Sequence, residues 1–418
     1  MTTVEGSARS LDVARRQADF PVLARKVHGH RLVYLDSAAT SQKPRAVLEA
    51  MTRFYETSNA NIHRGTYQMA VESTEAYEAA RRAVARFIGA PSPKGLVFTK
   101  NVTEAINLVA SSWGGANLRA GDAVVLTEIE HHANLVPWMM LRDRLGIELR
   151  FVPMAEDYTL DLTHLDRLLD GAKLMAFTAM SNVLGTLTPV RRIVDAAHAA
   201  GALVLVDGAQ LVPHVPTDVT ALDVDFFGFT GHKMCGPTGI GALWARPELL
   251  EAMPPFLGGG EMIRDVRLEG FTTAEVPTKF EAGTMPFAEA VGLHAAVEYL
   301  SAVGMDAVRE HEVSLTAYAL RALRERHGDD VTVYGPSEPA MRGGALSFSY
   351  KDIHPHDVSQ VLDQKGVCVR AGHHCAKPLM RRLGVGATTR ASLYLYNDES
   401  DVDALVDGLS DVDDLFSL

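Results

Sequence analysis

The sequence predicts an α/β protein, in which a large domain with a mainly parallel sheet flanked by helices precedes a smaller α+β domain. Between residues 96 and 244, short and nearly continuous apolar runs alternate with helical patterns. Such runs are typical of parallel strands that are buried on both faces. After residue 300 the pattern changes to one long helix followed by strands and further helices. The 418 residues are enough for two or three domains of ordinary size.

The strands expected in the large domain are apolar runs that follow polar or glycine-containing turns. They cover residues 96–98, 123–126, 173–178, 202–206, 225–229 and 242–244. Helices are expected over residues 104–110 and 189–200. Gly201 ends the second helix, because glycine readily adopts the left-handed conformation that terminates helices.

The smaller domain is expected to begin with an amphipathic helix over residues 305–327. Its other elements are strands over 331–333, 346–350, 367–370 and 391–396, and helices over 356–365 and from about 400. Ser400 and Asp403 resemble a capping box for the last helix, with aspartate in place of glutamate. We therefore divide the chain into residues 1–30, a segment that packs on the small domain, residues 31–300 and residues 301–418.

Composition and charge exclude several classes of protein. The formal net charge is −12 and the sequence contains no dense run of Lys and Arg, so nucleic acid is not an expected partner. No stretch approaches about 18 uncharged apolar residues, and Met1–Ser10 is polar, so neither a membrane span nor a signal peptide is expected. The three cysteines are too few for a disulfide framework and fit the reducing cytoplasm.

Two residues at neighbouring strand ends point to pyridoxal phosphate. Asp207 directly follows one predicted strand and Lys233 follows the next. Pyridoxal phosphate needs a lysine that forms a Schiff base with its aldehyde and a carboxylate that keeps its pyridine nitrogen protonated. Alone, either residue is more often a surface lysine or a strand-end aspartate. The pair, on successive strands, favours the cofactor.

Other residues at strand ends fit the same site. Thr103, near the start of the helix over 104–110, is placed to bind a phosphate, although it also fits an ordinary N-cap. One histidine of the pair His131 and His132 would stack on the cofactor ring, unless both are structural loop residues. Asn182 also follows a predicted strand and points to the same edge of the sheet.

A third motif, Arg370-Ala-Gly-His-His-Cys375-Ala-Lys377, leaves a strand of the small domain. The basic side chains around Cys375, including His373 and His374, predict a reactive thiol. A metal site is not expected, because adjacent residues cannot easily form a tetrahedral site and no Cys-x-x-Cys is present.

The other candidates are a single arginine and two cysteines. Arg390 would bind a substrate carboxylate with two hydrogen bonds, or else is a surface strand residue. Cys368 fits a small buried hydrophobic residue. Cys235 fits packing better than catalysis.

With these motifs, the chain resembles the SufS-type, or group II, cysteine desulfurases in the class V aminotransferase family of fold-type I pyridoxal phosphate enzymes. The resemblance runs from Leu35 to Tyr396. It rests on six ordered motifs: Asn61-Ile-His-Arg-Gly65, Glu130-His-His-Ala-Asn134, Val206-Asp-Gly-Ala-Gln210, Gly231-His-Lys233, Phe280-Glu-Ala-Gly-Thr284 and Arg370-Ala-Gly-His-His-Cys375.

The resemblance implies a role for each residue that would hold pyridoxal 5'-phosphate. Lys233 would be the Schiff-base lysine, Asp207 would pair with the pyridine nitrogen and Gln210 would bond the phenolic oxygen. His131 would stack on the ring. The phosphate would be held by Thr103, Thr230, His232 and, from the neighbouring copy of a homodimer, Thr284.

The resemblance also implies the reaction. L-cysteine would be converted to L-alanine, with Lys233 as the base and the sulfur left as a persulfide on Cys375. Asn182 and Arg390 would bind the substrate carboxylate, and the pocket would be lined by His63, Arg64, Arg370 and His373. A SufE-like or U-type acceptor would collect the sulfur for iron–sulfur cluster assembly. Tyr67 and Met285 depart from residues that are common in relatives.

Several alternatives stay open at this point. On the same fold, the protein could be a selenocysteine lyase or cysteine-sulfinate desulfinase, for which Cys375 is dispensable, or a desulfurase dedicated to another pathway. A nicotinamide-dependent oxidoreductase is disfavoured, because no Gly-x-Gly-x-x-Gly lies between a strand and a helix. A non-catalytic thiol or metal carrier would leave Asp207 and Lys233 unexplained.

Overall fold

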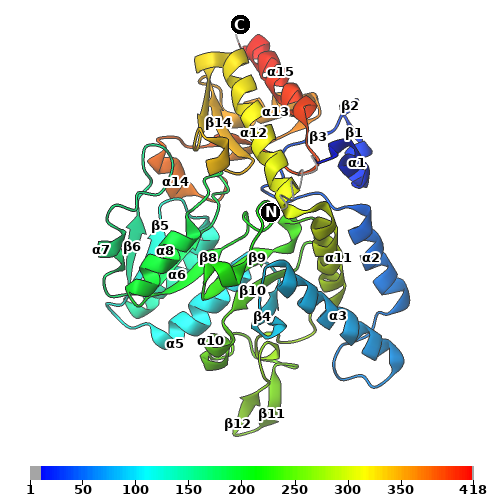
Figure 1. The fold of residues 1–418 in the computed structure, drawn as a ribbon, viewed down its shortest axis with the longest axis vertical. Coiled ribbons are helices and arrows are strands. Elements are labelled where there is room, and N and C mark those ends of the chain that lie inside the picture. The colour runs from blue at the N-terminus through cyan, green and yellow to red at the C-terminus, as the bar shows by residue number, and fades with distance from the viewer. Residues whose placement is uncertain (1–10, 417–418) are drawn as a thin grey trace, which may run out of the picture.

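The structure is a computed structural model that describes residues 11–416. Its centre is a seven-stranded sheet in the order β4-β10-β9-β8-β7-β5-β6 (Figure 1). The sheet consists of β4 (Leu96–Thr99), β5 (Ala123–Thr127), β6 (Glu148–Val152), β7 (Ala172–Thr178), β8 (Leu203–Asp207), β9 (Phe226–Thr230) and β10 (Gly241–Ala245). Strands β5 to β9 pair in parallel, and only β10 runs antiparallel to its neighbours. The prediction of a mainly parallel sheet is confirmed.

Helices cover both faces of this sheet, so its strands are buried on both sides, except for the partly exposed edge strand β6. Val125 packs into the core on one face, while Val124 and Leu126 pack into the core on the other. One core includes α3 (Gln68–Phe87), α7 (Leu165–Leu169), α8 (Val190–Ala199) and α11 (Phe287–Val303). The other includes α4 (Val102–Leu108), α6 (Val136–Leu145) and α10 (Pro247–Ala252). This burial explains the continuous apolar runs in the sequence.

The remaining helices of this part of the chain are shorter or lie at its margin. They are α1 (Val13–Ala18), α2 (Arg45–Thr57), α5 (Gly115–Asn117) and α9 (Val219–Leu222). A hairpin of β11 (Ile263–Arg267) and β12 (Gly270–Thr273) projects from the body of the molecule (Figure 1).

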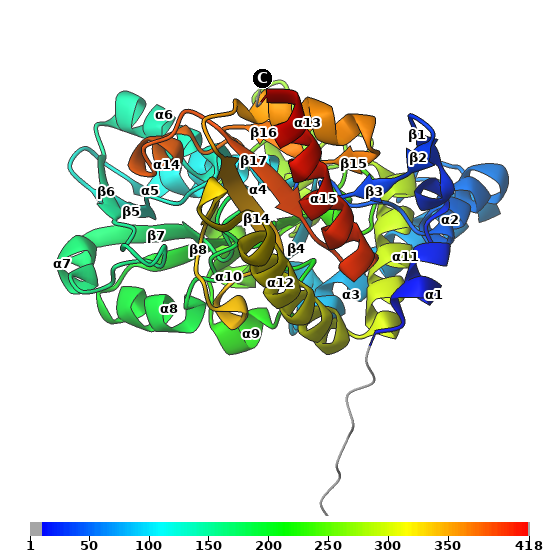
Figure 2. The ribbon, with the colours of Figure 1, turned by 90° about the horizontal axis from the view of Figure 1, so that it is seen from above.

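A second, four-stranded antiparallel sheet lies above the first and is covered by the last helices (Figure 2). It has the order β13-β14-β17-β16, with β13 (Val331–Tyr334), β14 (Ala345–Tyr350), β16 (Arg370–Gly372) and β17 (Thr388–Ser392). Its helices are α12 (Met305–His327), α13 (Pro355–Gln364), α14 (Lys377–Arg382) and α15 (Glu399–Phe416). The small α+β unit is therefore as predicted.

Two strand boundaries in the small unit differ from the prediction. The expected strand over 367–370 is two strands in two sheets: β15 (Val367–Cys368) pairs in parallel with β3 (Val33–Tyr34), whereas β16 pairs with β17. The apolar run that predicted a strand over 391–396 continues as buried chain after β17 ends, because the Tyr394 amide donates to the Asn397 side chain. The prediction extended the strand to residue 396 because these residues are apolar and buried, but they do not pair with a neighbouring strand.

The capping of α15 also differs from the prediction. The Asp401 amide donates to Asp398 Oδ1 and the Asp398 amide donates to Asp401 Oδ2, each at 3.3 Å. The reciprocal pair therefore lies two residues before the predicted Ser400 and Asp403. Asp401 is buried and also accepts from Asn397 Nδ2 at 2.9 Å, which fixes the earlier start of the helix.

The described part of the N-terminal segment contacts residues on both sides of the predicted boundary at residue 300. It contains α1 and the hairpin of β1 (Lys26–Val27) and β2 (His30–Arg31). Gln17 Nε2 donates to the Tyr396 carbonyl at 2.9 Å, and Asp19 Oδ2 accepts from the Tyr299 hydroxyl at 2.8 Å. The first ten residues lie outside the described part, and the division into three parts stays a prediction.

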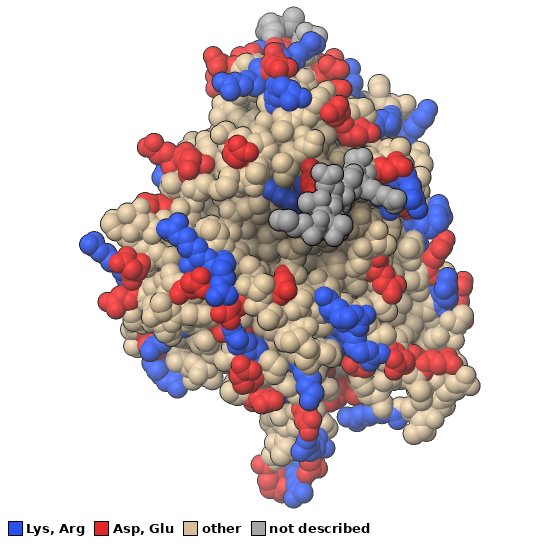
Figure 3. Space-filling model, viewed as in Figure 1, with Lys and Arg blue, Asp and Glu red and all other residues tan. Residues whose placement is uncertain are grey.

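Charges of both signs are interspersed over the face of the molecule in Figure 3. Over residues 11–416, no helix combines the length and the apolar character needed to cross a membrane.

A buried ion pair joins α3, β4 and the chain before α11. Glu281 Oε1 and Oε2 lie 2.6 and 2.8 Å from the Arg81 guanidinium, and the carboxylate also accepts from the Tyr77 hydroxyl and the Phe98 amide. Both charged side chains are only 3% exposed. Removing one charge of such a pair leaves the other uncompensated.

We expect Glu281→Gln to lower the free energy of unfolding by about 3 kcal/mol, because it leaves the buried Arg81 charge with the partly exposed Glu78 as its remaining counterion. Denaturant unfolding at neutral pH measures this change. Glu275→Gln is the control, since Glu275 pairs with Arg264 at the surface and its loss should cost less than about 0.5 kcal/mol. Equal effects of the two substitutions would contradict the prediction.

Candidate active site

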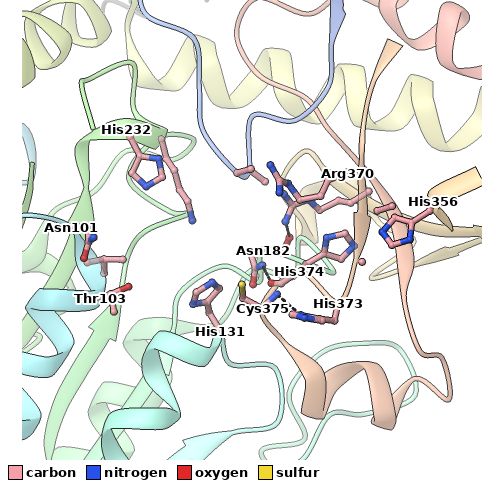
Figure 4. A pocket seen from close by; sticks show the side chains of 17 residues that line it. Asn101, Thr103, His131, Asn182, His232, His356, Arg370, His373, His374 and Cys375 are labelled. Atoms are coloured by element: carbon pink, nitrogen blue, oxygen red, sulfur yellow. Dashed lines mark hydrogen bonds between the residues drawn. The ribbon is translucent and has the colours of Figure 1, made fainter. Parts of the chain in front are cut away.

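A cavity of about 620 Å³ lies at the carboxyl ends of the parallel strands, between the two sheets. Nine residues predicted for the site line it: Thr103, His131, Asn182, His232, Lys233, Arg370, His373, Cys375 and Arg390. Figure 4 shows Asn101, Thr103 and His232 on one side, and Arg370, His373 and His356 on the other. His131, Asn182 and Cys375 lie between them. Residues far apart in the sequence therefore meet in one pocket.

The other predicted residues fall into two groups. Asp207, Gln210 and Thr230 are buried within the large sheet at the ends of β8 and β9. His63, Arg64 and Thr284 do not line the cavity, and Arg64 instead pairs with Glu261 at 3.2 Å. The His63 ring instead lies 6.0 Å from that of Tyr77, and Thr284 is exposed.

Lys233 lies in a turn that hydrogen bonds from the N-terminal part of the chain hold in place. The carbonyl of His232 accepts hydrogen bonds from Thr40 Oγ1, the Ser41 amide and Lys43 Nζ, each at 3.0 Å. Burial lowers the pKa of Lys233 to about 8, with Asp207 opposing this change. About a tenth of the amine is therefore uncharged at pH 7, and this is the form that accepts a proton.

Asp207 is a buried carboxylate that lies behind the residues lining the cavity. Its Oδ1 accepts from the Ala209 amide at 2.9 Å, and burial raises its pKa. The neighbouring Glu130 is also buried, which raises its pKa to about 8. Gln210 Nε2 donates to the Ala38 carbonyl at 2.7 Å, so one of its two amide hydrogens is already engaged.

The structure separates the roles of the two adjacent histidines. His131 lines the cavity, and its Nδ1 accepts from the Ala133 amide at 3.0 Å. Burial, together with Lys233, lowers the pKa of His131 to about 3, so its ring is neutral. His132 instead binds the cysteine-bearing loop, because its Nε2 accepts from the Lys377 amide at 2.9 Å.

The loop that carries Cys375 is held in a strained conformation. His374 and Cys375 have φ values of 49° and 55°, in the left-handed region that side chains other than glycine avoid. The His132 amide donates to the Cys375 carbonyl and Asn182 Nδ2 donates to the His374 carbonyl, both at 2.7 Å. These bonds fix the exposed thiol at the cavity.

The prediction that His374 adds positive charge beside Cys375 is wrong. His374 is buried, and its Nε2 bonds Thr388 Oγ1 at 2.9 Å. Burial lowers its pKa to about 3, so the ring stays neutral. Within residues 11–416, no cluster of three or more His, Cys, Asp or Glu side chains is arranged to hold a metal ion.

Arg390 is buried at the end of the cavity nearest the small sheet. Its Nη1 donates to the Asn182 carbonyl at 2.9 Å, and its Nη2 lies 3.3 Å from Asp36 Oδ1. Asp36 also pairs with Arg370, whose Nη2 lies 2.7 Å from Asp36 Oδ2. Although burial lowers the pKa of Arg390 to about 10, its guanidinium remains charged at neutral pH.

The two other cysteines are unlike Cys375. Cys235 is fully buried, its Sγ donates to the Tyr394 hydroxyl at 3.8 Å, and burial raises its pKa to about 12. Cys368 is partly exposed at β15, so the prediction that it is buried was wrong. Its strand, β15, forms a two-stranded sheet with β3, so one edge of the strand has no neighbouring strand.

Sequence reasoning missed several residues of the site. Asn101, not Thr103, caps α4, because its Oδ1 accepts from the Glu104 amide at 3.0 Å. Asp36, His132 and His356 also contact or line the cavity without having been assigned roles. Asp36 lies at the start of the stretch over which the chain resembles its family, but its arginine partners are more than 330 positions away. His356 carried no signal that set it apart from His354.

The residues present fit pyridoxal phosphate. Thr230 Oγ1 is buried without a hydrogen-bond partner in the described chain, as expected of a group that awaits a ligand oxygen. Lys233 presents a buried amine of lowered pKa, and Asp207 presents a buried carboxylate behind the same cavity. These are the two groups that the cofactor's aldehyde and pyridine nitrogen require.

Comparisons with known proteins place the chain in a family. Residues 33–405 match the family model described as Aminotransferase class-V. A relative from Streptomyces coelicolor, named "Probable cysteine desulfurase", is 52% identical over 412 residues, which cover 97% of this chain and 98% of that protein.

Solved structures match over nearly the whole length. The cysteine desulfurase CsdA from Escherichia coli is 41% identical, with a TM-score of 0.89 over 97% of this chain and 99% of that chain. A C-DES variant with glycine covalently linked to its pyridoxal phosphate cofactor is 24% identical, with a TM-score of 0.81 over 94% of this chain and 99% of that chain. The second likeness shows a shared fold.

We expect Lys233→Met to stabilise the cofactor-free protein by about 3 kcal/mol at pH 7, because the buried ammonium has a pKa about 2.5 units below that of the unfolded chain. The unfolded state binds more protons between pH 8 and pH 10.5, so wild-type stability rises with pH through this window and the difference disappears above it. Urea unfolding at pH 7 and pH 10.5 measures both values. Lys365→Met, at an exposed lysine, is the control, and a pH-independent difference for Lys233→Met would refute the assignment.

We expect His132→Ala to free the loop that carries Cys375. The substitution removes the acceptor of the Lys377 amide, so hydrogen exchange at that amide should accelerate about tenfold. Exchange measured by mass spectrometry on the peptide over residues 372–379 reports this change. His164→Ala, at an exposed histidine, should leave it unchanged. Unaltered exchange in His132→Ala would mean that other contacts hold the loop.

Proposed function

The chain belongs to the aminotransferase class-V family, and from this premise we propose that it is a pyridoxal phosphate-dependent cysteine desulfurase that converts L-cysteine to L-alanine. The observation that carries the proposal is the meeting of Lys233 and Cys375 in one cavity. One residue supplies a buried amine from the large sheet, and the other supplies an exposed thiol from the loop after the small sheet. Relatives that share about half of the sequence carry the same name.

Pyridoxal phosphate, when bound, withdraws electrons from the substrate Cα and so stabilises negative charge there. Thr103, Thr230 and His232 would hold its phosphate, and Asp207 would hold its pyridine nitrogen. His131 is neutral, so it would meet the ring without adding a competing positive charge.

The chain's own residues then account for binding and proton transfer. The substrate carboxylate would bind at Arg390, beside Asn182, because the guanidinium is buried, charged and open to the cavity. Lys233 Nζ would take the proton from the substrate Cα, since its lowered pKa leaves part of the amine free near neutral pH.

Cys375 would take the sulfur. Its thiolate would attack the substrate sulfur, forming a sulfur–sulfur bond while the Cβ–sulfur bond breaks and leaves its electron pair on carbon. Cβ would gain a proton, alanine would leave and a persulfide would remain on Cys375. The exposure of the thiol supports transfer of this sulfur to a second protein.

The finer parts of the proposal concern partners and pathway. We propose a homodimer, to which Thr284 would contribute from the exposed loop of the partner copy, and a SufE-like or U-type sulfur acceptor for iron–sulfur cluster assembly. Exposed apolar side chains on the β11–β12 hairpin, such as Leu268 and Phe271, support a covering partner. Three free cysteines support a reducing, cytoplasmic location. The short loop at Cys375 supports the group II assignment.

We expect brief exposure of the holoenzyme to L-cysteine, without reductant, to add one sulfur atom to Cys375 and to release alanine. Peptide mapping by mass spectrometry locates the sulfur, and amino-acid analysis measures alanine. Lys233→Ala should abolish both, because the Cα proton is no longer removed. Cys368→Ala should change neither, since it removes a thiol that does not line the cavity.

Two outcomes would overturn the proposal in different ways. Alanine released at an undiminished rate by Cys375→Ala would indicate a lyase or desulfinase that does not use the thiol. A holoenzyme that releases no alanine, even with candidate acceptors present, would act on another substrate.

A further inference from the structure

Lys43 is a half-buried lysine that does not line the cavity and is assigned no part in the reaction above. Its Nζ donates to the His232 carbonyl at 3.0 Å, to the Ser41 carbonyl and, at 3.5 Å, to Thr40 Oγ1. In the described part of the chain, no carboxylate pairs with it. All three hydrogens of the ammonium group are therefore directed at oxygen atoms of uncharged groups.

The charge of Lys43 is costly where it lies. Burial lowers the pKa of Lys43 to about 8, so about nine tenths of the amine still carries a charge at pH 7. A charged group held away from water without a counterion costs folding free energy, and an uncharged side chain would fill the same space at a lower cost. The groups that this ammonium holds are therefore the place to look for its role.

The peptide between His232 and Lys233 is the group that the ammonium shares with the cavity. Both side chains line the cavity. Because a peptide is planar, the direction of the His232 carbonyl fixes where the amide nitrogen and Cα of Lys233 lie. A displacement of this one peptide would move the Lys233 amine and the His232 ring together.

Four hydrogen-bond donors converge on the His232 carbonyl, and Lys43 is the charged one. The others are Thr40 Oγ1 and the amide and Oγ of Ser41, and all four lie 3.0 to 3.2 Å from the carbonyl oxygen. Charge-assisted hydrogen bonds are about twice as strong as neutral ones. Since Lys43 also bonds Thr40 and Ser41, it orders the segment that supplies the other donors.

We propose that Lys43 is a positioning residue, whose ammonium holds the peptide between His232 and Lys233 and so places the Lys233 amine for its reactions. Two consequences follow. The amine is held where it meets the aldehyde of pyridoxal phosphate, and it is held where it takes a proton from the substrate Cα. The second consequence rests on the proposed function, whereas the first depends only on the cofactor.

The first test uses the full-length chain freed of cofactor. Addition of pyridoxal phosphate produces visible absorbance as the Schiff base with Lys233 forms, and stopped-flow spectroscopy measures the rate. We expect Lys43→Met, which keeps the length of the side chain but not its charge, to slow this rate about tenfold, because the amine is less well placed. Hydrogen exchange over residues 230–236 of the cofactor-free chain should also accelerate about tenfold.

The second test separates positioning from substrate binding in the holoenzyme, with rates expressed per bound cofactor. We expect Lys43→Met to lower kcat for L-cysteine about tenfold and to leave KM within about twofold, because Arg390 and Asn182 are unchanged. Lys43→Arg keeps the charge and the donors, so its capture rate and kcat should stay within about threefold of wild type. A loss of folded protein alone would lower neither value per bound cofactor.

Arg150→Met is the matched control. Arg150 is also a cation that donates to backbone carbonyls, those of Leu168 and Asp170 at 3.0 and 2.7 Å, but it does not line the cavity or touch the turn at Lys233. Its substitution should leave the capture rate, the exchange over residues 230–236 and kcat unchanged. Thermal unfolding of each variant identifies a misfolded protein, and Lys43→Gln replaces Lys43→Met if the latter does not fold.

The failure of this inference and the failure of the proposed function give different results. Unchanged capture and exchange in folded Lys43→Met, or an equal effect of Arg150→Met, would refute the role of Lys43 while the desulfurase function stands. Slow capture in Lys43→Met, together with a wild-type holoenzyme that releases no alanine from L-cysteine, would refute the proposed function and leave the placement of Lys233 by Lys43 supported.

Discussion

The contact of Asp36 with Arg370 and Arg390 is the point at which three parts of the chain meet. Asp36 comes from the segment after β3, and the arginines come from β16 and β17 of the small sheet. Through the Asn182 carbonyl, Arg390 reaches the loop after β7 of the large sheet. If this cluster were absent, the wall of the cavity would lose one of its connections between the two sheets, although the bonds from His132 and Asn182 to the thiol loop would remain.

The cavity is built at a cost in folding free energy. Lys233, Glu130 and Arg390 are ionisable groups held away from water, and burial shifts the pKa of each so as to favour its neutral form. His374 and Cys375 add backbone strain of about 1–3 kcal/mol each. The two large apolar cores on the faces of the seven-stranded sheet supply the stability that offsets these terms.

The fold and half of the site could be predicted because their signals are local. Apolar runs fix six of the seven strands of the large sheet, all but the partly exposed edge strand β6, and Asp207, Lys233 and Cys375 stand at or shortly after strand ends. Residues whose position depends on distant partners could not be found in this way. The contacts of Asp36 are with arginines of the small sheet, which are distant in the sequence. Strand β15 is separate from β16 because it pairs with β3 instead. His374 has the sequence signal of a basic residue, but its burial makes it neutral.

The length of the thiol loop sets a limit on how sulfur can leave the enzyme. Residues 373–376 are all that lies between β16 and α14. Even with its hydrogen bonds broken, so short a segment would carry its middle no more than about 9 Å from its anchored ends. The Cys375 side chain therefore cannot carry sulfur far from the cavity. For the acceptor proposed above, this means that its own thiol would have to reach the rim of the cavity, which His356 also lines.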